Sequence, residues 1–165
     1  MLDVPFQLNG EAKLIAFHPV VVTGASGFLG RHVVEEIRKS NNSIIAICRN
    51  NLNNPPNLQL NEIAEVTSSS TVDEFEEFFA SVDGPVVLVH LAAHYSNLHS
   101  AGDVSMLVES NIHFPTRLID ALARAKPNST VINISTLFQH FESKEYSPLS
   151  LYGATKESFL KILDF

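Results

Sequence analysis

Residues 20–30 have the sequence VVVTGASGFLG, a β-branched run that passes directly into a glycine-rich turn. The three valines are typical of a short, fully buried strand. Apolar residues at helical spacing then continue to about Ser40. Glycines with this GxxGxxG spacing let the chain turn tightly, let backbone N–H groups approach a pyrophosphate and let a helix pack closely on a strand. We therefore expect a strand, an anion-binding turn at a helix N-terminus and a helix, with an ordinary strand-to-helix turn as the alternative.

Strand and helix patterns alternate along the rest of the chain. Four further apolar runs predict strands, at residues 43–48, within 58–66, at 85–92 and at 130–134. Three further stretches predict helices, at residues 71–80, 103–126 and 151–163. Continuous apolar strands alternating with helices are typical of an α/β domain with a doubly wound parallel sheet, the Rossmann type, covered by helices on both faces. We expect about five strands in one domain over residues 19–165, preceded by an N-terminal extension over residues 1–18.

Composition excludes several classes of function. The 165 residues have a formal net charge of −7, which argues against binding to a nucleic-acid backbone. The apolar runs are far shorter than the roughly 20 residues of a membrane helix, and residues 1–18 lack the pattern of a signal peptide. Cys48 is the only cysteine, so an intrachain disulfide is excluded and a reducing compartment is favoured. We expect a cytoplasmic protein that binds neither nucleic acid nor a membrane.

Seven histidines suggest a metal site at first. However, His90 belongs to a predicted strand, His94 and His99 belong to a loop, and no carboxylate-bearing motif accompanies them at ligand spacing. We therefore expect no metal.

Motifs from residue 20 to the end of the chain resemble the extended short-chain dehydrogenase/reductase family, also called the NAD-dependent epimerase/dehydratases. After the glycine turn, the matches in chain order are HLAA at 90–93, Asn111, IST at 134–136 and YGATK at 152–156. Residues 133–152 are most similar to the branch that reduces nucleotide-linked 4-keto-6-deoxyhexoses, such as CDP-abequose synthases. Family members continue into a C-terminal substrate-binding region, so the resemblance implies an NAD(P)-binding Rossmann domain that is incomplete in this chain.

The resemblance implies that Tyr152 exchanges a proton with the substrate carbonyl or alcohol, that Lys156 also binds the nicotinamide ribose, and that Thr136 hydrogen-bonds the reacting oxygen. Ser135 is the alternative to Thr136, and a hydroxyl at a strand end can also simply satisfy backbone groups. Tyr152 and Lys156 are four residues apart and share one helix face. An ammonium roughly 5 Å from the phenol, at an effective dielectric of about 20, contributes on the order of 3 kcal/mol. We therefore expect the Tyr152 pKa to be lowered by about 2 units.

Asn111 lies four residues before Pro115, which lacks an N–H and would clash with the Asn111 carbonyl in a regular helix. We expect the helix to open there, and the resemblance implies that the freed carbonyl holds a water linked to the active-site lysine. The alternative is a proline that ends one helix and begins another. The resemblance also implies a set of residues that bind the cofactor: Gly24, Ser26, Gly27, Phe28, Leu29, Gly30, Arg49, Leu91, Ala92, Ala93, Tyr152 and Lys156.

Arg49 follows the second strand where NAD-preferring relatives tend to carry an acid, and a guanidinium suits the 2′-phosphate of NADP. A solvated loop arginine, with NAD as cofactor, is the alternative. The resemblance implies NADP(H)-dependent hydride transfer to a keto group of a nucleotide-linked sugar, with Tyr152 as proton donor. An NAD-retaining nucleotide-sugar epimerase or dehydratase is the alternative enzyme, although Leu137 and Phe138 occupy the positions where dehydrating relatives place Asp-Glu. A third alternative is a non-catalytic cofactor-binding module or inactive fragment.

The resemblance also implies a homodimer. Relatives usually associate through the two helices that correspond to residues 103–126 and 151–163, and both stretches carry apolar residues on more than one face.

Overall fold

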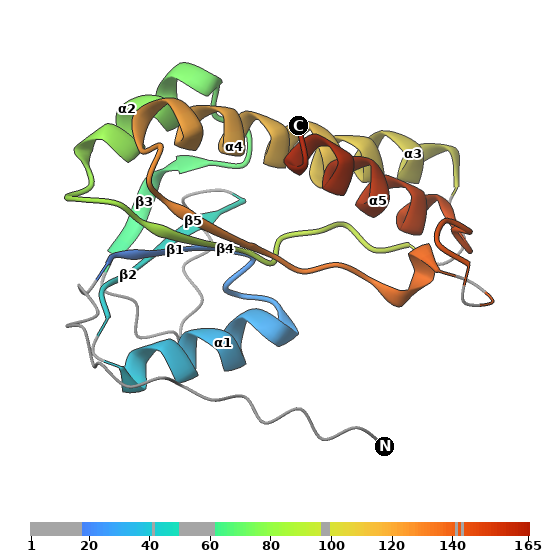
Figure 1. Ribbon diagram of the computed structural model, residues 1–165, viewed down its shortest axis with the longest axis horizontal. Helices are drawn as coiled ribbons and strands as arrows, with labels where there is room; N and C mark the ends of the chain where they lie inside the picture. Colours follow the sequence, from blue (N-terminus) through green and yellow to red (C-terminus); the bar gives the residue numbers. More distant parts are fainter. Residues whose placement is uncertain (1–17, 41, 50–61, 97–99, 141, 143) are drawn as a thin grey trace.

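A single parallel sheet organises the molecule (Figure 1). The computed structural model describes residues 18–40, 42–49, 62–96, 100–140, 142 and 144–165. In this part of the chain the sheet has five strands in the order β3-β2-β1-β4-β5. The strands are β1 (Val20–Thr23), β2 (Ile44–Cys48), β3 (Glu62–Thr67), β4 (Val87–His90) and β5 (Thr130–Asn133). The α/β fold predicted from the sequence is confirmed, whereas the predicted extension over residues 1–18 lies outside the described residues except for His18.

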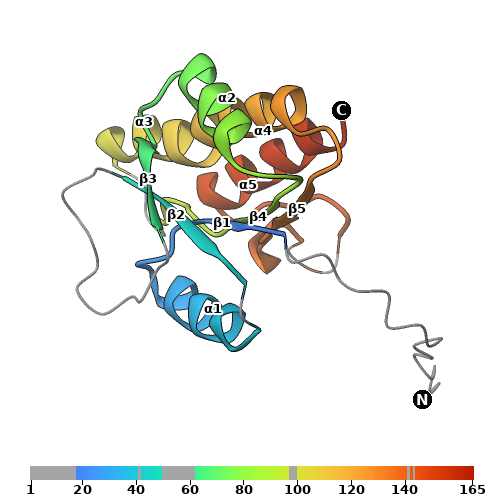
Figure 2. The ribbon, with the colours of Figure 1, turned by 90° about the vertical axis from the view of Figure 1, so that its left-hand side faces the viewer.

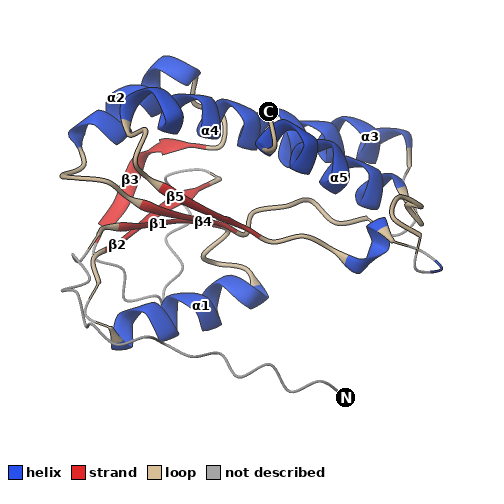
Figure 3. Cartoon of the chain, viewed as in Figure 1, coloured by secondary structure: helices blue, strands red, loops and turns tan. Residues whose placement is uncertain are grey.

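Helices cover the two faces of the sheet unequally (Figure 2, Figure 3). Of the α-helices in the described residues, only α1 (Phe28–Lys39) lies on one face. The opposite face carries α2 (Val72–Ser81), α3 (Ala101–Val108), α4 (Phe114–Ala125) and α5 (Leu151–Leu163). Ile132 of the edge strand β5 and Ile134, which follows that strand, are 46% and 40% exposed.

Alternate strand residues supply two separate cores, as the two-residue period of a strand requires. Val21 and Leu88 are fully buried toward α2 and α4, where they join a cluster with Phe75 and Leu118. Val22 belongs to the smaller cluster on the α1 side. The central strands are therefore buried on both faces, which explains their continuous apolar sequences.

The stretch predicted as one helix over residues 103–126 contains a π-helical turn, Glu109–His113, between α3 and α4. The N–H of Phe114 bonds the Glu109 carbonyl, five residues back, immediately before Pro115. Proline supplies no N–H to a carbonyl four residues earlier, so the wider turn accommodates it. The predicted opening at Asn111 is thus present, in the form of a π turn.

A short helix that the sequence analysis did not predict, η2 (Leu137–Gln139), follows β5. No helix in the described ranges is long and apolar enough to cross a bilayer.

Candidate active site

The strand order reverses between β2 and β4, which pair with opposite edges of β1. At such a switch point the loops after the strands separate and leave a crevice at their carboxyl ends. The glycine turn lies there, between β1 and α1. Gly24 adopts a φ of +70°, and a Cβ on it would lie 2.7 Å from the Ala92 nitrogen. A Cβ on Gly30 would lie 2.1 Å from the Gly24 carbonyl oxygen, so the close packing of α1 on this turn, predicted from the glycine spacing, is confirmed.

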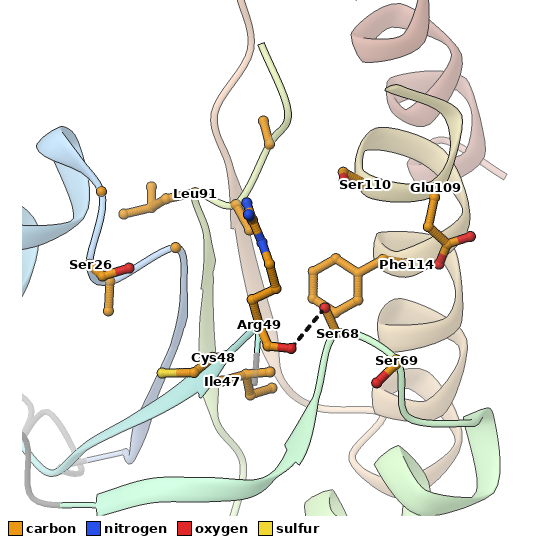
Figure 4. A pocket seen from close by; sticks show the side chains of 15 residues that line it. Ser26, Ile47, Cys48, Arg49, Ser68, Ser69, Leu91, Glu109, Ser110 and Phe114 are labelled. Atoms are coloured by element: carbon orange, nitrogen blue, oxygen red, sulfur yellow. Dashed lines mark hydrogen bonds between the residues drawn. The ribbon is translucent and has the colours of Figure 1, made fainter. Parts of the chain in front are cut away.

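A pocket of about 440 Å³ opens beside this turn (Figure 4). Helix α1 begins after Gly27 without a side-chain cap, so its first N–H groups have no side-chain partner from the cap position. The pocket is lined by the turn, by the carboxyl ends of β2, β3 and β4, and by the π turn and α4: Gly24, Ala25, Ser26, Gly27, Ile47, Cys48, Arg49, Ser68, Ser69, Leu91, Ala92, Ala93, Glu109, Ser110 and Phe114. Uncapped N–H groups at a helix N-terminus, in a partly apolar pocket of this size, fit a nucleotide with its pyrophosphate at the turn.

Seven of the predicted cofactor-binding residues line this pocket: Gly24, Ser26, Gly27, Arg49, Leu91, Ala92 and Ala93. Five do not: Phe28, Leu29, Gly30, Tyr152 and Lys156. Gly30 faces the backbone of Gly24 and Ala25, and the Phe28 side chain is 83% exposed. Gly30 therefore serves the packing of α1 in this structure.

Arg49 is exposed at the end of β2, and its side chain extends into the pocket (Figure 4). Its backbone carbonyl accepts a hydrogen bond from the Ser68 hydroxyl at 3.4 Å. The serine loop that supplies Ser68 and Ser69 was not among the predicted site residues. Its position directly after the third strand was the available signal, because the carboxyl ends of parallel strands lie at one edge of the sheet.

Arg117 of α4 holds this serine loop in place. Its guanidinium donates to the carbonyls of Ser70 at 2.6 Å and Ser68 at 3.1 Å. It also pairs with Glu109 of the π turn at 2.8 Å. One arginine thus fixes two walls of the pocket relative to each other.

Tyr152 lies in the first turn of α5, half-buried in an aromatic cluster. Its ring meets the rings of Tyr95 and Phe138 edge-on, at centroid distances of 5.0 and 6.5 Å. Burial and the neighbouring Tyr95 raise the pKa of Tyr152, whereas a hydrogen bond with the Thr136 side chain lowers it. The net direction is upward, so the predicted lowering of this pKa by Lys156 is wrong for this structure: the loss of hydration outweighs the favourable interactions.

Lys156 is only 4% exposed, and burial lowers the pKa of its ammonium. His90, at the end of β4, is also buried, and its ring donates to or accepts from the Thr23 hydroxyl at 2.8 Å. Burial, with a smaller contribution from the nearby Lys156, lowers the pKa of His90 to about 3. His90 is therefore neutral at physiological pH.

The side chain of Asn111 has a role that the sequence analysis did not predict. Its Oδ1 accepts from the His94 N–H at 2.8 Å, and its Nδ2 donates to the His94 carbonyl at 2.9 Å and to the Thr155 hydroxyl at 3.0 Å. This buried amide ties the π turn to the loop after β4 and to α5. It consequently fixes the residue that precedes Lys156.

Of the two hydroxyls at the end of β5, Ser135 donates to the Gln139 side chain. The Thr136 Oγ1 accepts from the Phe138 N–H at 3.3 Å, and the Thr136 side chain lies close enough to Tyr152 to lower the pKa of its phenol. The structure thus brings Thr136 and Tyr152 together and directs Ser135 elsewhere. Among the residues that the structure describes, no three His, Cys, Asp or Glu side chains are grouped as metal ligands; His99 lies outside them.

Comparison with known proteins identifies relatives of the whole described domain. The model of the NAD dependent epimerase/dehydratase family matches residues 20–164. CDP-abequose synthase from Salmonella typhimurium is 27% identical over 143 residues, which are 87% of this chain and 46% of that protein. A putative UDP-glucose 4-epimerase from Methanocaldococcus jannaschii is 26% identical over 154 residues, 87% of this chain and 50% of that protein. The chain thus spans about half the length of these curated relatives.

The solved structure of MoeE5 in complex with UDP-glucose and NAD is 25% identical to this chain. It superposes with a TM-score of 0.67 over 87% of this chain and 47% of MoeE5. The described domain therefore shares the fold of MoeE5 over the superposed part of the two chains.

Proposed function

Since the chain belongs to the NAD dependent epimerase/dehydratase family, we propose that it is the cofactor-binding half of an NADP(H)-dependent reductase that acts on a keto group of a nucleotide-linked sugar. The observation that carries this proposal is that one segment, the loop after β4, both lines the pocket and contacts Tyr152. Leu91–Ala93 lines the pocket, and Tyr95, two residues later, packs against Tyr152 at 5.0 Å. A dinucleotide bound at the glycine turn therefore has a path along this segment toward Tyr152.

Three side chains supply the proton chemistry in this proposal. Tyr152 donates the proton to the substrate oxygen, and the Thr136 hydroxyl, which lowers the pKa of the phenol, holds that oxygen beside it. Lys156 contributes a buried positive charge near the ribose of the cofactor. Asn111 connects α5 to the loop after β4, because its amide bonds both Thr155 and His94. The nicotinamide, when bound, supplies the hydride.

The raised pKa of Tyr152 in the structure is consistent with a proton donor that keeps its proton until substrate and cofactor are bound. Lys156 lies one turn further along the same helix, and a positive charge there would favour the phenolate formed by proton transfer.

Arg49 favours NADP over NAD as the cofactor. Its side chain enters the pocket at the end of β2, where the adenine ribose of a dinucleotide bound to this turn would lie. The adjoining side chains are the thiol of Cys48 and the hydroxyls of Ser68 and Ser69. Within the described lining, Glu109 is the only carboxylate, and it is already paired with Arg117 at 2.8 Å.

Turnover by the intact protein tests this function. NADPH absorbance is followed with nucleotide-linked 4-keto-6-deoxyhexoses, and Tyr152→Phe is expected to lower kcat by about 10²- to 10⁴-fold, since only the proton donor is removed. The same variant should bind NADPH nearly as tightly as the wild type, whereas Lys156→Ala should lose both turnover and affinity. A Tyr152→Phe enzyme with a kcat within threefold of the wild type would exclude the proposed role.

An NAD-retaining nucleotide-sugar epimerase is the second candidate. It is favoured by the 26% identity to the putative UDP-glucose 4-epimerase and by the NAD bound to MoeE5. The two candidates differ in their stoichiometry: an epimerase converts its sugar with no net consumption of added NADPH, whereas a reductase consumes one NADPH per sugar.

A further inference from the structure

Arg117 of α4 meets three successive backbone carbonyls of the serine loop after β3. Its Nη1 donates to the Ser70 carbonyl at 2.6 Å and lies 3.5 Å from the carbonyl oxygen of Ser69. Its Nη2 donates to the Ser68 carbonyl at 3.1 Å and to the Glu109 carboxylate at 2.8 Å. The arginine and the loop are 47 to 49 positions apart in the sequence, so these bonds exist only in the folded chain.

The conformation of the serine loop requires a donor at the place that Arg117 occupies. Successive carbonyl oxygens that point toward one place carry partial negative charges that repel one another. A guanidinium suits this place because it presents several donors in one plane and carries a positive charge. The Arg117 side chain is only 16% exposed, and its Nε is buried with no acceptor among the described residues. An apolar side chain would fill the same space without the cost of a buried, unpaired donor, so the guanidinium does more than fill space.

Arg117 is not itself part of the pocket lining, whereas three of its partners are. Ser68, Ser69 and Glu109 all line the pocket (Figure 4). The two serines follow β3, and Glu109 begins the π turn, so they belong to separate walls. Any effect of Arg117 on a ligand in this pocket is therefore exerted through these partners.

The sheet holds the other side of the serine loop. The Ser68 N–H bonds the Cys48 carbonyl at the end of β2 at 3.2 Å. The Ser70 N–H bonds the Thr67 carbonyl at the end of β3 at 3.0 Å. Arg117 adds the connection from the loop to the helical wall of the pocket.

We propose that Arg117 is a positioning residue for the nucleotide, because it fixes the serine loop against the π turn and so forms this wall of the pocket before a ligand binds. The identity of the ligand rests on the proposed function: with the pyrophosphate at the glycine turn and the ribose at Arg49, the adenine of a dinucleotide reaches this wall. A wall that is already ordered raises affinity, since binding then does not have to order the loop.

The position of the loop can be tested without any ligand, by ¹⁵N relaxation of the backbone amides. In the wild type, the order parameters of residues 68–70 should be about 0.85, the value of rigid backbone. Arg117→Met keeps a long unbranched side chain but removes the donors, and it should lower these order parameters below about 0.6. Val21 and Leu88 in the central strands should keep their wild-type values in this variant, because the change is confined to the loop.

Binding of NADPH measures the consequence for the pocket. Arg117→Met should raise the dissociation constant by about tenfold or more, the effect of losing charge-assisted hydrogen bonds. Arg117→Lys keeps a cation without the planar fork and should give an intermediate constant, and it carries both measurements if the methionine variant does not fold. Arg124→Met is the matched control, because Arg124 lies on the same helix and pairs with Asp120 at 3.0 Å on the exposed side. It should leave both the order parameters and the dissociation constant unchanged.

Arg117 also neutralises Glu109, and a double variant separates this effect from positioning. Arg117→Met alone leaves the Glu109 carboxylate in the pocket wall without its guanidinium partner. Adding Glu109→Gln removes that negative charge but does not restore the bonds to the serine loop. The double variant should therefore bind NADPH no more than about twofold more tightly than Arg117→Met.

The inference is overturned if residues 68–70 have the same order parameters in the Arg117 variants as in the wild type, or if Val21 and Leu88 lose order as much as the loop does. It is also overturned if the Arg117 variants bind NADPH as tightly as the wild type, or if the double variant regains wild-type affinity. A folded wild type that does not bind NADPH would refute the proposed function, while the order parameters would still decide whether Arg117 fixes the loop.

Discussion

Gly24 and Gly84 offer a comparison that isolates the contact between the glycine turn and the end of β4. Both have positive φ angles, +70° and +69°, which an alanine adopts at a cost of about 1 kcal/mol. A Cβ on Gly84 would meet nothing within 4 Å. A Cβ on Gly24 would lie 2.7 Å from the Ala92 nitrogen and 2.9 Å from the Leu91 carbonyl carbon, and backbone cannot move aside as a flexible side chain can.

Gly84→Ala should therefore lower the free energy of unfolding by about 1 kcal/mol, and Gly24→Ala by about 2 to 4 kcal/mol, since forced overpacking adds about 1 to 3 kcal/mol. Equilibrium urea unfolding, monitored by circular dichroism, measures both values when the slopes of the transitions agree. Gly24→Ala should also lose affinity for NADPH, whereas Gly84→Ala should keep it. Equal destabilisation by the two substitutions would refute the argument that the turn is pressed against the end of β4.

Three further predictions concern cofactor choice, pH and association. Arg49→Ala should remove a preference for NADPH over NADH of about 1 to 3 kcal/mol, measured as the ratio of the two dissociation constants. An unchanged ratio would show that Arg49 does not cause the preference. Burial lowers the pKa of His90 from 6.5 to about 3, so the unfolded chain binds a proton at this residue more readily than the folded one. The free energy of unfolding should therefore decrease as the pH falls from 6.5 to about 3, by up to about 4 kcal/mol. Urea unfolding from pH 7 to pH 4 measures this, and His90→Asn should flatten the slope; an unaltered slope would contradict it. The apolar side chains Val104, Met106 and Val108 of α3 are 40 to 49% exposed, and we expect a second copy of the chain to cover them. Light scattering should therefore give twice the 18.2 kDa of one chain, and Met106→Glu should shift the mass toward the monomer. A monomeric mass for the wild type at micromolar concentration would contradict the dimer.

The parts of the fold that follow from local sequence were predictable. Continuous apolar runs gave the buried strands, and the helix expected over residues 151–163 is α5, which begins after the capping residue Ser150. The clash expected between Pro115 and the Asn111 carbonyl located the π turn, although not its type. The glycine spacing located the pocket because Gly24 has a positive φ and Gly30 leaves no room for a Cβ against the Gly24 carbonyl.

The parts that depend on distant segments were not predictable. Nothing adjacent to Gln139 in the sequence indicates that its amide meets Glu157, and nothing near Arg117 indicates that it binds the serine loop after β3. The pKa of Tyr152 was assigned the wrong direction because its spacing from Lys156 is a local property, whereas its burial among Tyr95 and Phe138 is a tertiary one. Side-chain networks of this kind require the arrangement of the sheet to be known first.

The most direct test of the cofactor site is a titration of the 165-residue chain with NADPH and with NADH. The chain contains no tryptophan, so the fluorescence of the nicotinamide can be followed without protein emission from that source. We predict saturable binding of one dinucleotide per chain, tighter for NADPH, and greatly weakened by Gly24→Ala. Absence of saturable binding for both dinucleotides by the folded chain, or equal affinities that Gly24→Ala leaves unchanged, would contradict the account.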